Sequence, residues 1–133
     1  MKEQELQEKV AMYQILQQYL EALQQQANLL QNKMVELQST KQALQNFDEI
    51  KKSDVLIPLG SGCYAHGKLE EGKILTDIGA GVVLEREVSK AIESLEVREK
   101  DIESALQKLQ KDAEAAAKNI ALLAQEIQKL TSP

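Results

Sequence analysis

Residues 55–84 read VLIPLGSGCYAHGKLEEGKILTDIGAGVVL, and they hold all 6 glycines of the 133-residue chain and Pro58, one of its 2 prolines. Short apolar or alternating runs in this stretch are separated by glycine-rich or polar turns, which is the pattern of β-hairpins. We expect two successive hairpins built from four short strands, at residues 55–59, 63–69, 74–78 and 82–84. The stretch is therefore a small β region set into a longer chain.

The segment before this β region carries a heptad repeat. Between residues 6 and 44, positions spaced alternately by three and four residues are apolar in 10 of 12 cases, as in the seam of a coiled coil. The exceptions are Lys9 and Lys41. The seam positions are Leu6, Lys9, Tyr13, Leu16, Leu20, Leu23, Ala27, Leu30, Met34, Leu37, Lys41 and Leu44. Because residues 1–57 contain neither glycine nor proline, we expect one long helix over residues 1–50.

The segment after the β region repeats the pattern. Between residues 88 and 130, 12 of 13 seam positions are apolar, and Glu99 is the exception. A helix of such length cannot bury its apolar stripe alone, so we expect a second helix over residues 86–131 that packs antiparallel against the first. Lys41 and Glu99 would then lie within about one helical turn of each other, and we predict that they approach. The alternative is that both side chains extend separately to water.

The four short strands would form a sheet with exposed edges, which is marginally stable by itself. We expect this region to pair with strands of other chains and to close a β-barrel, which removes the edges. The residues expected to mediate oligomerisation are Val55, Leu56, Ile57, Leu59, Ile74, Ile78, Val82 and Val83. The predicted fold class is mainly α with a small β part: a long antiparallel coiled-coil hairpin joined through two β-hairpins at 54–85, within one domain, 1–133, that contributes to an oligomeric β-barrel platform.

Composition argues against several classes of protein. The only cysteine, Cys63, excludes an intramolecular disulfide framework, and with a single histidine present it argues against a structural zinc site. The net charge of −5 argues against a protein that binds nucleic-acid phosphates. No uncharged apolar run approaches the roughly 20 residues of a membrane span, and the first residues lack the apolar core of a secretory signal. We expect a soluble cytoplasmic protein with no metal, nucleic-acid or membrane partner.

Three patterns resemble catalytic or nucleotide sites, and each has a simpler interpretation. Residues 62–69 nearly match the phosphate-binding loop G-x-x-x-x-G-K-[ST], but Leu69 replaces the hydroxyl that would hold Mg²⁺, and no helical pattern follows. Cys63 and His66 could suggest a nucleophile and its base, but residues three apart in a strand point to opposite faces. The adjacent glutamates at 70–71 are typical of a solvated turn. We therefore expect no catalytic residue, no cofactor and no enzymatic activity.

The order helix, two hairpins, helix, together with three short motifs, resembles an alpha-class subunit of prefoldin. The motifs are Val55-Leu56-Ile57-Pro58-Leu59-Gly60, Tyr64 with Gly67-Lys68-Leu69, and Ile78-Gly79-Ala80-Gly81. The resemblance covers essentially the whole chain. Beta-class subunits carry a single hairpin, so the second hairpin favours the alpha class. His66 stands where relatives often have an apolar residue, and this departure adds no catalytic role.

The resemblance implies an assembly and an activity. Two alpha-class and four beta-class chains would form a hexamer, in which the hairpins build a double β-barrel platform and the coiled coils extend from it. The complex would capture non-native proteins at the tips of the coiled coils and deliver them to a chaperonin without ATP. Several weak apolar contacts at different tips would add up to useful affinity through avidity. The partners implied are therefore beta-class subunits, unfolded client proteins and a chaperonin.

The two helix ends remote from the hairpins would form the client-binding tip. The candidate residues are Leu6, Val10, Ala11, Met12, Leu122, Leu123, Ile127 and Leu130. Four of them are also seam positions, namely Leu6, Leu123, Ile127 and Leu130, so their apolar character is equally well explained by packing between the helices. Val10, Met12 and Leu122 lie off the seam, where helix pairing does not explain an apolar residue. A coiled-coil scaffold or tether without client binding is the alternative function.

Overall fold

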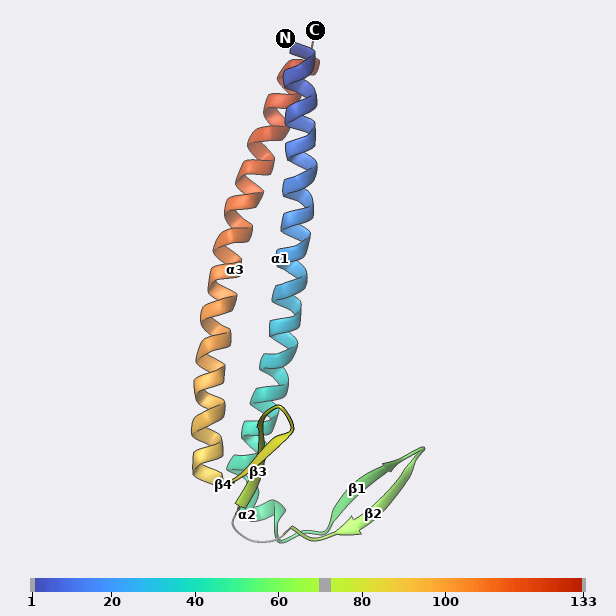
Figure 1. Ribbon diagram of the computed structural model, residues 1–133, viewed down its shortest axis with the longest axis vertical. Helices are drawn as coiled ribbons and strands as arrows, with labels where there is room; N and C mark the ends of the chain where they lie inside the picture. The colour runs from blue at the N-terminus through green and yellow to red at the C-terminus, as the bar shows by residue number, and fades with distance from the viewer. Residues whose placement is uncertain (1, 70–72, 133) are drawn as a thin grey trace. The chain divides into compact units, whose positions relative to one another are not determined.

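The computed structural model describes residues 2–69 and 73–132, and its elements follow the order helix, two hairpins, helix (Figure 1). The chain divides into two compact units. Unit 1 combines Met1–Lys33 with Ile102–Pro133, and unit 2 is Met34–Asp101. The long helices α1, Lys2–Gln45, and α3, Val88–Thr131, contribute to both units. The predicted class, long helices with two antiparallel β-hairpins, is confirmed.

The helices pair through the heptad seam. In unit 1 the buried residues are Leu23, Ala116 and Leu123, and all of them are seam positions. Within this unit the start of α1 lies beside the end of α3 (Figure 1), and Lys9 Nζ lies 2.6 Å from Glu126 Oε2, so the two helices are antiparallel there. The outward positions are occupied mainly by Gln, Glu and Lys, which keeps the solvated side polar.

In unit 2 the seam involves the end of α1 and the start of α3. The buried residues of unit 2 are the seam residues Met34, Leu37 and Leu44, together with Ala91, which precedes the seam residue Ile92. Lys41 and Glu99, the two seam positions that carry charge here, form an ion pair of 3.4 Å. The prediction that these residues approach is thus confirmed, and neither side chain extends to water alone.

The first helix ends earlier than expected. We expected one helix to residue 50, but α1 ends at Gln45, and a separate short helix, α2, spans Phe47–Ile50 after a break at Asn46. The seam gives the physical reason. After Leu44 the next seam positions are the charged residues Asp48 and Lys51, which pair with each other at 3.1 Å, so the apolar seam ends at Leu44. Asparagine is also a weak helix former, because its side chain competes for backbone hydrogen bonds.

Two separate hairpins make up the β region. Strand β1, Val55–Gly60, pairs antiparallel with β2, Cys63–Gly67. Strand β3, Lys73–Gly79, pairs antiparallel with β4, Val82–Glu87. Two strand ends differ from expectation by more than one residue: β2 stops at Gly67, two residues before Leu69, and β4 runs three residues past Leu84. The strand continues to Glu87 because residues 85–87 pair with β3, and Glu87 lies opposite Lys73. These three residues are charged, so their sequence showed no apolar strand pattern.

The two hairpin turns have the same construction. Gly60-Ser61-Gly62 and Gly79-Ala80-Gly81 each place three successive residues at positive φ, and the register shifts by one residue beside each turn. Glycine adopts this left-handed region without steric cost, whereas Ser61 and Ala80, with φ of 51° and 52°, do not. In the second turn the Asp77 carboxylate also accepts a hydrogen bond of 2.8 Å from the Gly79 amide. The motif G-x-G therefore sets the tight reversal of both hairpins.

Candidate functional site

The patterns that resembled catalytic sites lie on exposed β-structure. Cys63 and His66 are both in β2, opposite Gly60 and Leu56 of β1 respectively, and both are exposed. The segment that resembled a phosphate-binding loop forms a turn and strand β2, so it does not open a helix N-terminus that could hold a phosphate. The turn acids at 70–71 lie outside the described residues. Within 2–69 and 73–132, no cluster of three metal-ligating side chains is present.

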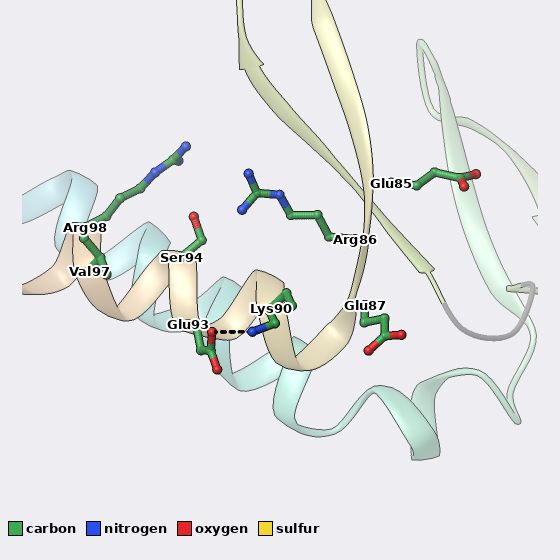
Figure 2. A pocket seen from close by; sticks show the side chains of 8 residues that line it. All are labelled: Glu85, Arg86, Glu87, Lys90, Glu93, Ser94, Val97 and Arg98. Atoms are coloured by element: carbon green, nitrogen blue, oxygen red, sulfur yellow. Dashed lines mark hydrogen bonds and ion pairs between the residues drawn. The ribbon is translucent and has the colours of Figure 1, made fainter.

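A concave region where β4 meets α3 is charged rather than apolar. This cleft of about 770 Å³ is lined by Glu85, Arg86, Glu87, Lys90, Glu93, Ser94, Val97 and Arg98. Figure 2 shows Arg86, Ser94 and Arg98 on its inner side, while Lys90 and Glu93 pair with each other at 3.4 Å. The three acids balance the three bases, and only Val97 is a large apolar residue. Six of the eight lining residues are charged, whereas a small-molecule site usually has only a few polar groups.

The hairpins expose apolar side chains on both faces. Of the residues expected to mediate oligomerisation, Val55 and Ile74 are half-buried. The others are exposed: Leu56, Ile57, Leu59, Ile78, Val82 and Val83. Leu56 and Tyr64 lie on one face of the first hairpin, and Ile57 lies on the other, where its side chain covers Gly67. Sequence reasoning omitted three exposed residues that belong to the same sheets, Tyr64, Leu75 and Leu84.

The hairpins are also incomplete as sheets. Among the described residues, β1 pairs only with β2, and β3 only with β4. Each strand therefore has one edge whose backbone N–H and C=O groups have no strand partner. Open edges and two apolar faces are what a sheet presents when further strands are to be added.

The predicted tip residues in unit 1 separate into two groups. Leu123 is buried, and Leu6, Ile127 and Leu130 are half-buried, so these four seam residues pack between the helices. Val10, Ala11, Met12 and Leu122 are exposed, and the last of these is 57% exposed. The structure thus leaves the second group available on the surface of unit 1.

An ion pair links α1 and α3 near the predicted tip residues. Lys9 donates a hydrogen bond of 2.6 Å to Glu126 of α3 and lies 3.8 Å from Glu5 of its own helix. The hydrogen bond to Glu126, with the negative charges of Glu126 and Glu5, raises the pKa of the Lys9 ammonium above its ordinary value, against a smaller opposing effect of burial. Lys9, one of the two charged exceptions in the seam of α1, therefore forms an ion pair that links α1 to α3.

Sequence reasoning missed a second apolar row on α1. We call it the outer stripe, and it consists of Met12, Ile15, Tyr19, Ala22 and Leu29, all exposed. Ile15 is 65% exposed and Leu29 63%. Each member directly precedes a seam residue, as Ile15 precedes Leu16, so the stripe repeats the alternating spacing of three and four. This repeat was present in the sequence, and a search for a second seam beside the first would have found it.

One member of the outer stripe, Leu29, lines a groove of unit 1. The groove has a volume of about 530 Å³ and is lined by Leu23, Gln26, Leu29, Leu30 and Lys33 of α1 and by Ala105, Lys108, Leu109 and Asp112 of α3. Its lining includes four leucines and three charged residues, Lys33, Lys108 and Asp112. It is an open groove along two helices, with the shape and composition of a surface that receives an apolar segment.

Comparisons with known proteins agree on one family. The family described as Prefoldin subunit matches residues 16–132. The chain is 42% identical over 109 residues to the prefoldin subunit alpha of Archaeoglobus fulgidus, covering 80% of each, and 31% identical to that of Pyrococcus horikoshii, covering 90% of this chain and 85% of the relative. A chain of filamentous PFD from Methanocaldococcus jannaschii has the same fold, with a TM-score of 0.70 and 21% identity over 90% of this chain and 98% of that one.

Proposed function

The chain belongs to the prefoldin family, with its resemblance to alpha subunits confirmed, and we propose that it is a subunit of a cytoplasmic, ATP-independent chaperone. In this proposal the exposed apolar residues of unit 1 bind non-native proteins, which the complex then delivers to a chaperonin. One observation carries the proposal. Unit 1 buries its seam and still exposes large apolar side chains, such as Met12 and Leu122, that pairing of the two helices does not require.

Assembly is the second part of the proposal. The hairpins of unit 2 pair with hairpins of beta-class subunits, two alpha-class chains with four beta-class chains, and the whole chain acts as one prefoldin-like subunit. The open strand edges and the exposed Leu56, Leu59 and Val82 support this step. Adding strands to both hairpins would satisfy the edge backbone groups and cover the apolar faces at the same time.

Binding of this kind is reversible without nucleotide. Burying one Leu-sized side chain contributes roughly 1.5–3 kcal/mol, much of which is offset by the entropy lost on association. A single contact is therefore weak and short-lived, while several subunits acting on one client reach useful affinity through avidity. Because each contact dissociates by itself, the client can pass to a second binder as the contacts open one after another.

The test is suppression of client aggregation. We would dilute a chemically denatured protein into buffer with the assembled complex and follow light scattering with and without ATP. We expect suppression that does not depend on nucleotide. In a variant that combines Met12→Gln and Leu122→Gln, suppression should fall several-fold while the mass of the assembly is unchanged. The matched control is Val97→Gln, an equally exposed apolar residue in unit 2, which should leave suppression intact.

Two outcomes would contradict the proposal. A wild-type assembly that fails to slow aggregation would favour the scaffold function, in which the coiled coil only tethers its partners. The half-buried seam residues Leu6, Ile127 and Leu130 are compatible with that alternative, because they pack between helices in either case. Suppression that required ATP would instead indicate an energy-dependent activity. Truncation of residues 1–12 and 121–133 provides a coarser version of the test and should abolish suppression without preventing assembly.

A further inference from the structure

Both arginines of the chain line the same cleft, the charged one where β4 meets α3. They are Arg86 of β4 and Arg98 of α3. We propose that these two arginines bind a carboxylate on a strand of a beta-class partner subunit, and that this contact selects the partner and its register. The proposal rests on the proposed function, because it names one contact through which the hairpins of unit 2 assemble. It is carried by the placement of the arginines, the pairing of their neighbours and the open edge of β4.

The two arginines reach the cleft from different elements. On α3, Ser94 and Arg98 are four residues apart and so lie on one face of the helix. Figure 2 shows Arg86 extending from the strand towards the helix, while Ser94 and Arg98 extend from the helix into the same space. Arg86 and Ser94 are half-buried, and Arg98 is exposed. A guanidinium is a planar fork of donors that fits a carboxylate through two parallel hydrogen bonds.

Two of the acids that line the cleft face another cation. Side chains alternate along a strand, so Glu85 and Glu87 lie on the face of β4 opposite to that of Arg86. Figure 2 shows both glutamates pointing away from Arg86. On their face of the sheet, Glu85 Oε2 lies 3.9 Å from Lys73 Nζ, and Glu87 lies opposite Lys73 in the strand register. These two acids therefore leave the charge of Arg86 unopposed.

Neither arginine has an ion-pair partner within residues 2–69 and 73–132. The third acid of the cleft, Glu93, pairs with Lys90 at 3.4 Å. Asp101 follows Arg98 by three residues on α3 and does not line the cleft. The cleft is thus neutral as a whole but divided, with lysines and glutamates paired on one side and two guanidinium groups without a counter-charge on the other.

The strand that holds Arg86 indicates the occupant. β4 pairs with β3 along one edge, and its other edge has no strand partner among the described residues. A strand added to that edge would place one residue directly opposite Arg86, about 5 Å away between Cα atoms, with its side chain on the same face. Because Arg86 and Arg98 line one cleft, a carboxylate at this position can accept hydrogen bonds from both.

The strands of this chain do not offer such a carboxylate to a second copy. Their acids are Asp77 of β3 and Glu85 and Glu87 of β4. Asp77 already accepts a hydrogen bond from the Gly79 amide, and the two glutamates face Lys73. A different chain is therefore the better source of the carboxylate, and the beta-class subunit is the different chain of the proposed hexamer.

Such a contact favours one register of the added strand. Shifting that strand by one residue moves its carboxylate to the other face of the sheet, away from both arginines. There it would meet Glu85 and Glu87, so the wrong register brings like charges together. A partner with a neutral residue opposite Arg86 would cover the guanidinium without supplying a counter-charge. Both effects act against incorrect pairing.

The experiment measures assembly of the full chain with a beta-class prefoldin subunit. Native mass spectrometry gives the concentration at which half of the chain is assembled. Arg86→Gln combined with Arg98→Gln should raise this concentration by about tenfold or more, and the double change to glutamate should raise it further. The double change to lysine keeps the charge but loses the planar fork, so it should fall between wild type and the glutamine variant.

The matched control removes the same charge elsewhere on α3. Lys100→Gln combined with Lys111→Gln changes two exposed lysines outside the cleft and should shift the half-assembly concentration by less than about twofold. Circular dichroism checks that each variant keeps its helical content.

A compensating change in the partner identifies the carboxylate. Each acid in the strands of the beta-class subunit would be changed to arginine, one at a time, and mixed with the Arg86→Glu, Arg98→Glu variant. One of these changes should restore assembly with that variant and weaken assembly with the wild-type chain.

Three results would overturn the inference. Undiminished assembly of the glutamate variant would show that the arginines bind no partner, while the proposed assembly would stand. A loss that no change in the partner restores would show that the arginines act within their own chain. Association of the chain with itself that depends on both arginines would place the carboxylate on a second copy. Failure of the wild-type chain to assemble with a beta-class subunit would instead contradict the proposed function itself.

Discussion

The coiled coil of unit 1 and the hairpins of unit 2 both expose large apolar residues, but they differ in how their backbones are satisfied. Within α1 and α3 the backbone hydrogen bonds close inside each helix, and the seam is buried between them. Each hairpin strand instead has an open edge, and both faces of the sheet carry apolar groups. The coil is complete without its ligand, whereas the hairpins are not complete without neighbouring strands.

This difference separates two kinds of binding. A surface that is stable when empty suits contacts that form and dissociate repeatedly. A sheet with open edges gains backbone hydrogen bonds as well as apolar burial when another strand is added, so its association should be long-lived. The comparison therefore supports the proposal that unit 2 mediates lasting assembly and that unit 1 binds clients transiently.

Charging the hairpin faces should abolish assembly. Leu56→Lys combined with Leu75→Lys places an ammonium on each hairpin, where a partner strand would have to bury it without a counter-charge. We expect the mass measured by multi-angle light scattering to fall to that of a single chain. The matched control is Leu29→Lys on the coil, which is 63% exposed, close to the 61% of Leu56. That control should keep the full mass, and loss of assembly in both variants would remove the distinction between the two regions.

Truncating the seam should destabilise the coil strongly. Leu23 is 7% exposed, and Leu23→Ala removes packed methyl groups and leaves a cavity, at a cost of about 2–5 kcal/mol. Thermal unfolding by circular dichroism, at one protein concentration, measures the change. Leu29→Ala is the control, since an exposed side chain of the outer stripe should change stability by less than about 0.5 kcal/mol. Similar losses for the two variants would mean that the outer stripe is also covered in the free protein.

Removing one partner of the ion pair between Lys41 and Glu99 should lower the stability of the coil more than replacing both partners by leucine. Both side chains are less than one quarter exposed, so Glu99→Leu leaves Lys41 partly buried without a partner and should cost roughly 1–3 kcal/mol. The double variant Lys41→Leu, Glu99→Leu continues the apolar seam and should be as stable as wild type or more stable. A double variant that is less stable than wild type would show that the pair itself stabilises the coil.

The smallest effect concerns the pair of Lys9 with Glu126 and its dependence on pH. Because the folded state raises the pKa of Lys9, the pair contributes stability below the ordinary lysine pKa and loses it as the pH rises through the raised value. The difference in melting temperature between wild type and Lys9→Met should be a few degrees at most near pH 7. On the alkaline side of neutrality it should shrink as the pH rises through the raised pKa of Lys9. A difference that instead disappeared on moving from pH 8 to pH 6 would contradict the assignment to Lys9.

Much of the fold was predictable because heptad periodicity is a long-range signal. More than five repeats before the β region and six after it indicated two paired helices, and the charged exceptions at Lys41 and Glu99 indicated how they align. The break after α1 was missed because the helix was extended to residue 50 on the absence of glycine and proline alone. The end of the apolar seam at Leu44, followed by Asp48 and Lys51 at the next two seam positions, was the signal available in the sequence.

The surfaces were harder to predict than the fold. Seam residues near the chain ends, such as Leu123 and Ile127, read as tip candidates in the sequence because burial cannot be judged from a repeat alone. The outer stripe escaped notice because one apolar row per helix already explained the coil. Likewise β4 was predicted too short, since the pairing of Arg86 with Ile74 and of Glu87 with Lys73 depends on the partner strand and not on apolar alternation.

The central claim is that the hairpins are completed by strands of neighbouring subunits, and native mass spectrometry tests it most directly. The chain of 14.8 kDa would be measured alone and after mixing with a beta-class prefoldin subunit at micromolar concentration. The account predicts that the mixture contains a hexamer of two copies of this chain and four of the partner. A spectrum showing only single copies of this chain, folded and unassociated in every mixture, would contradict it.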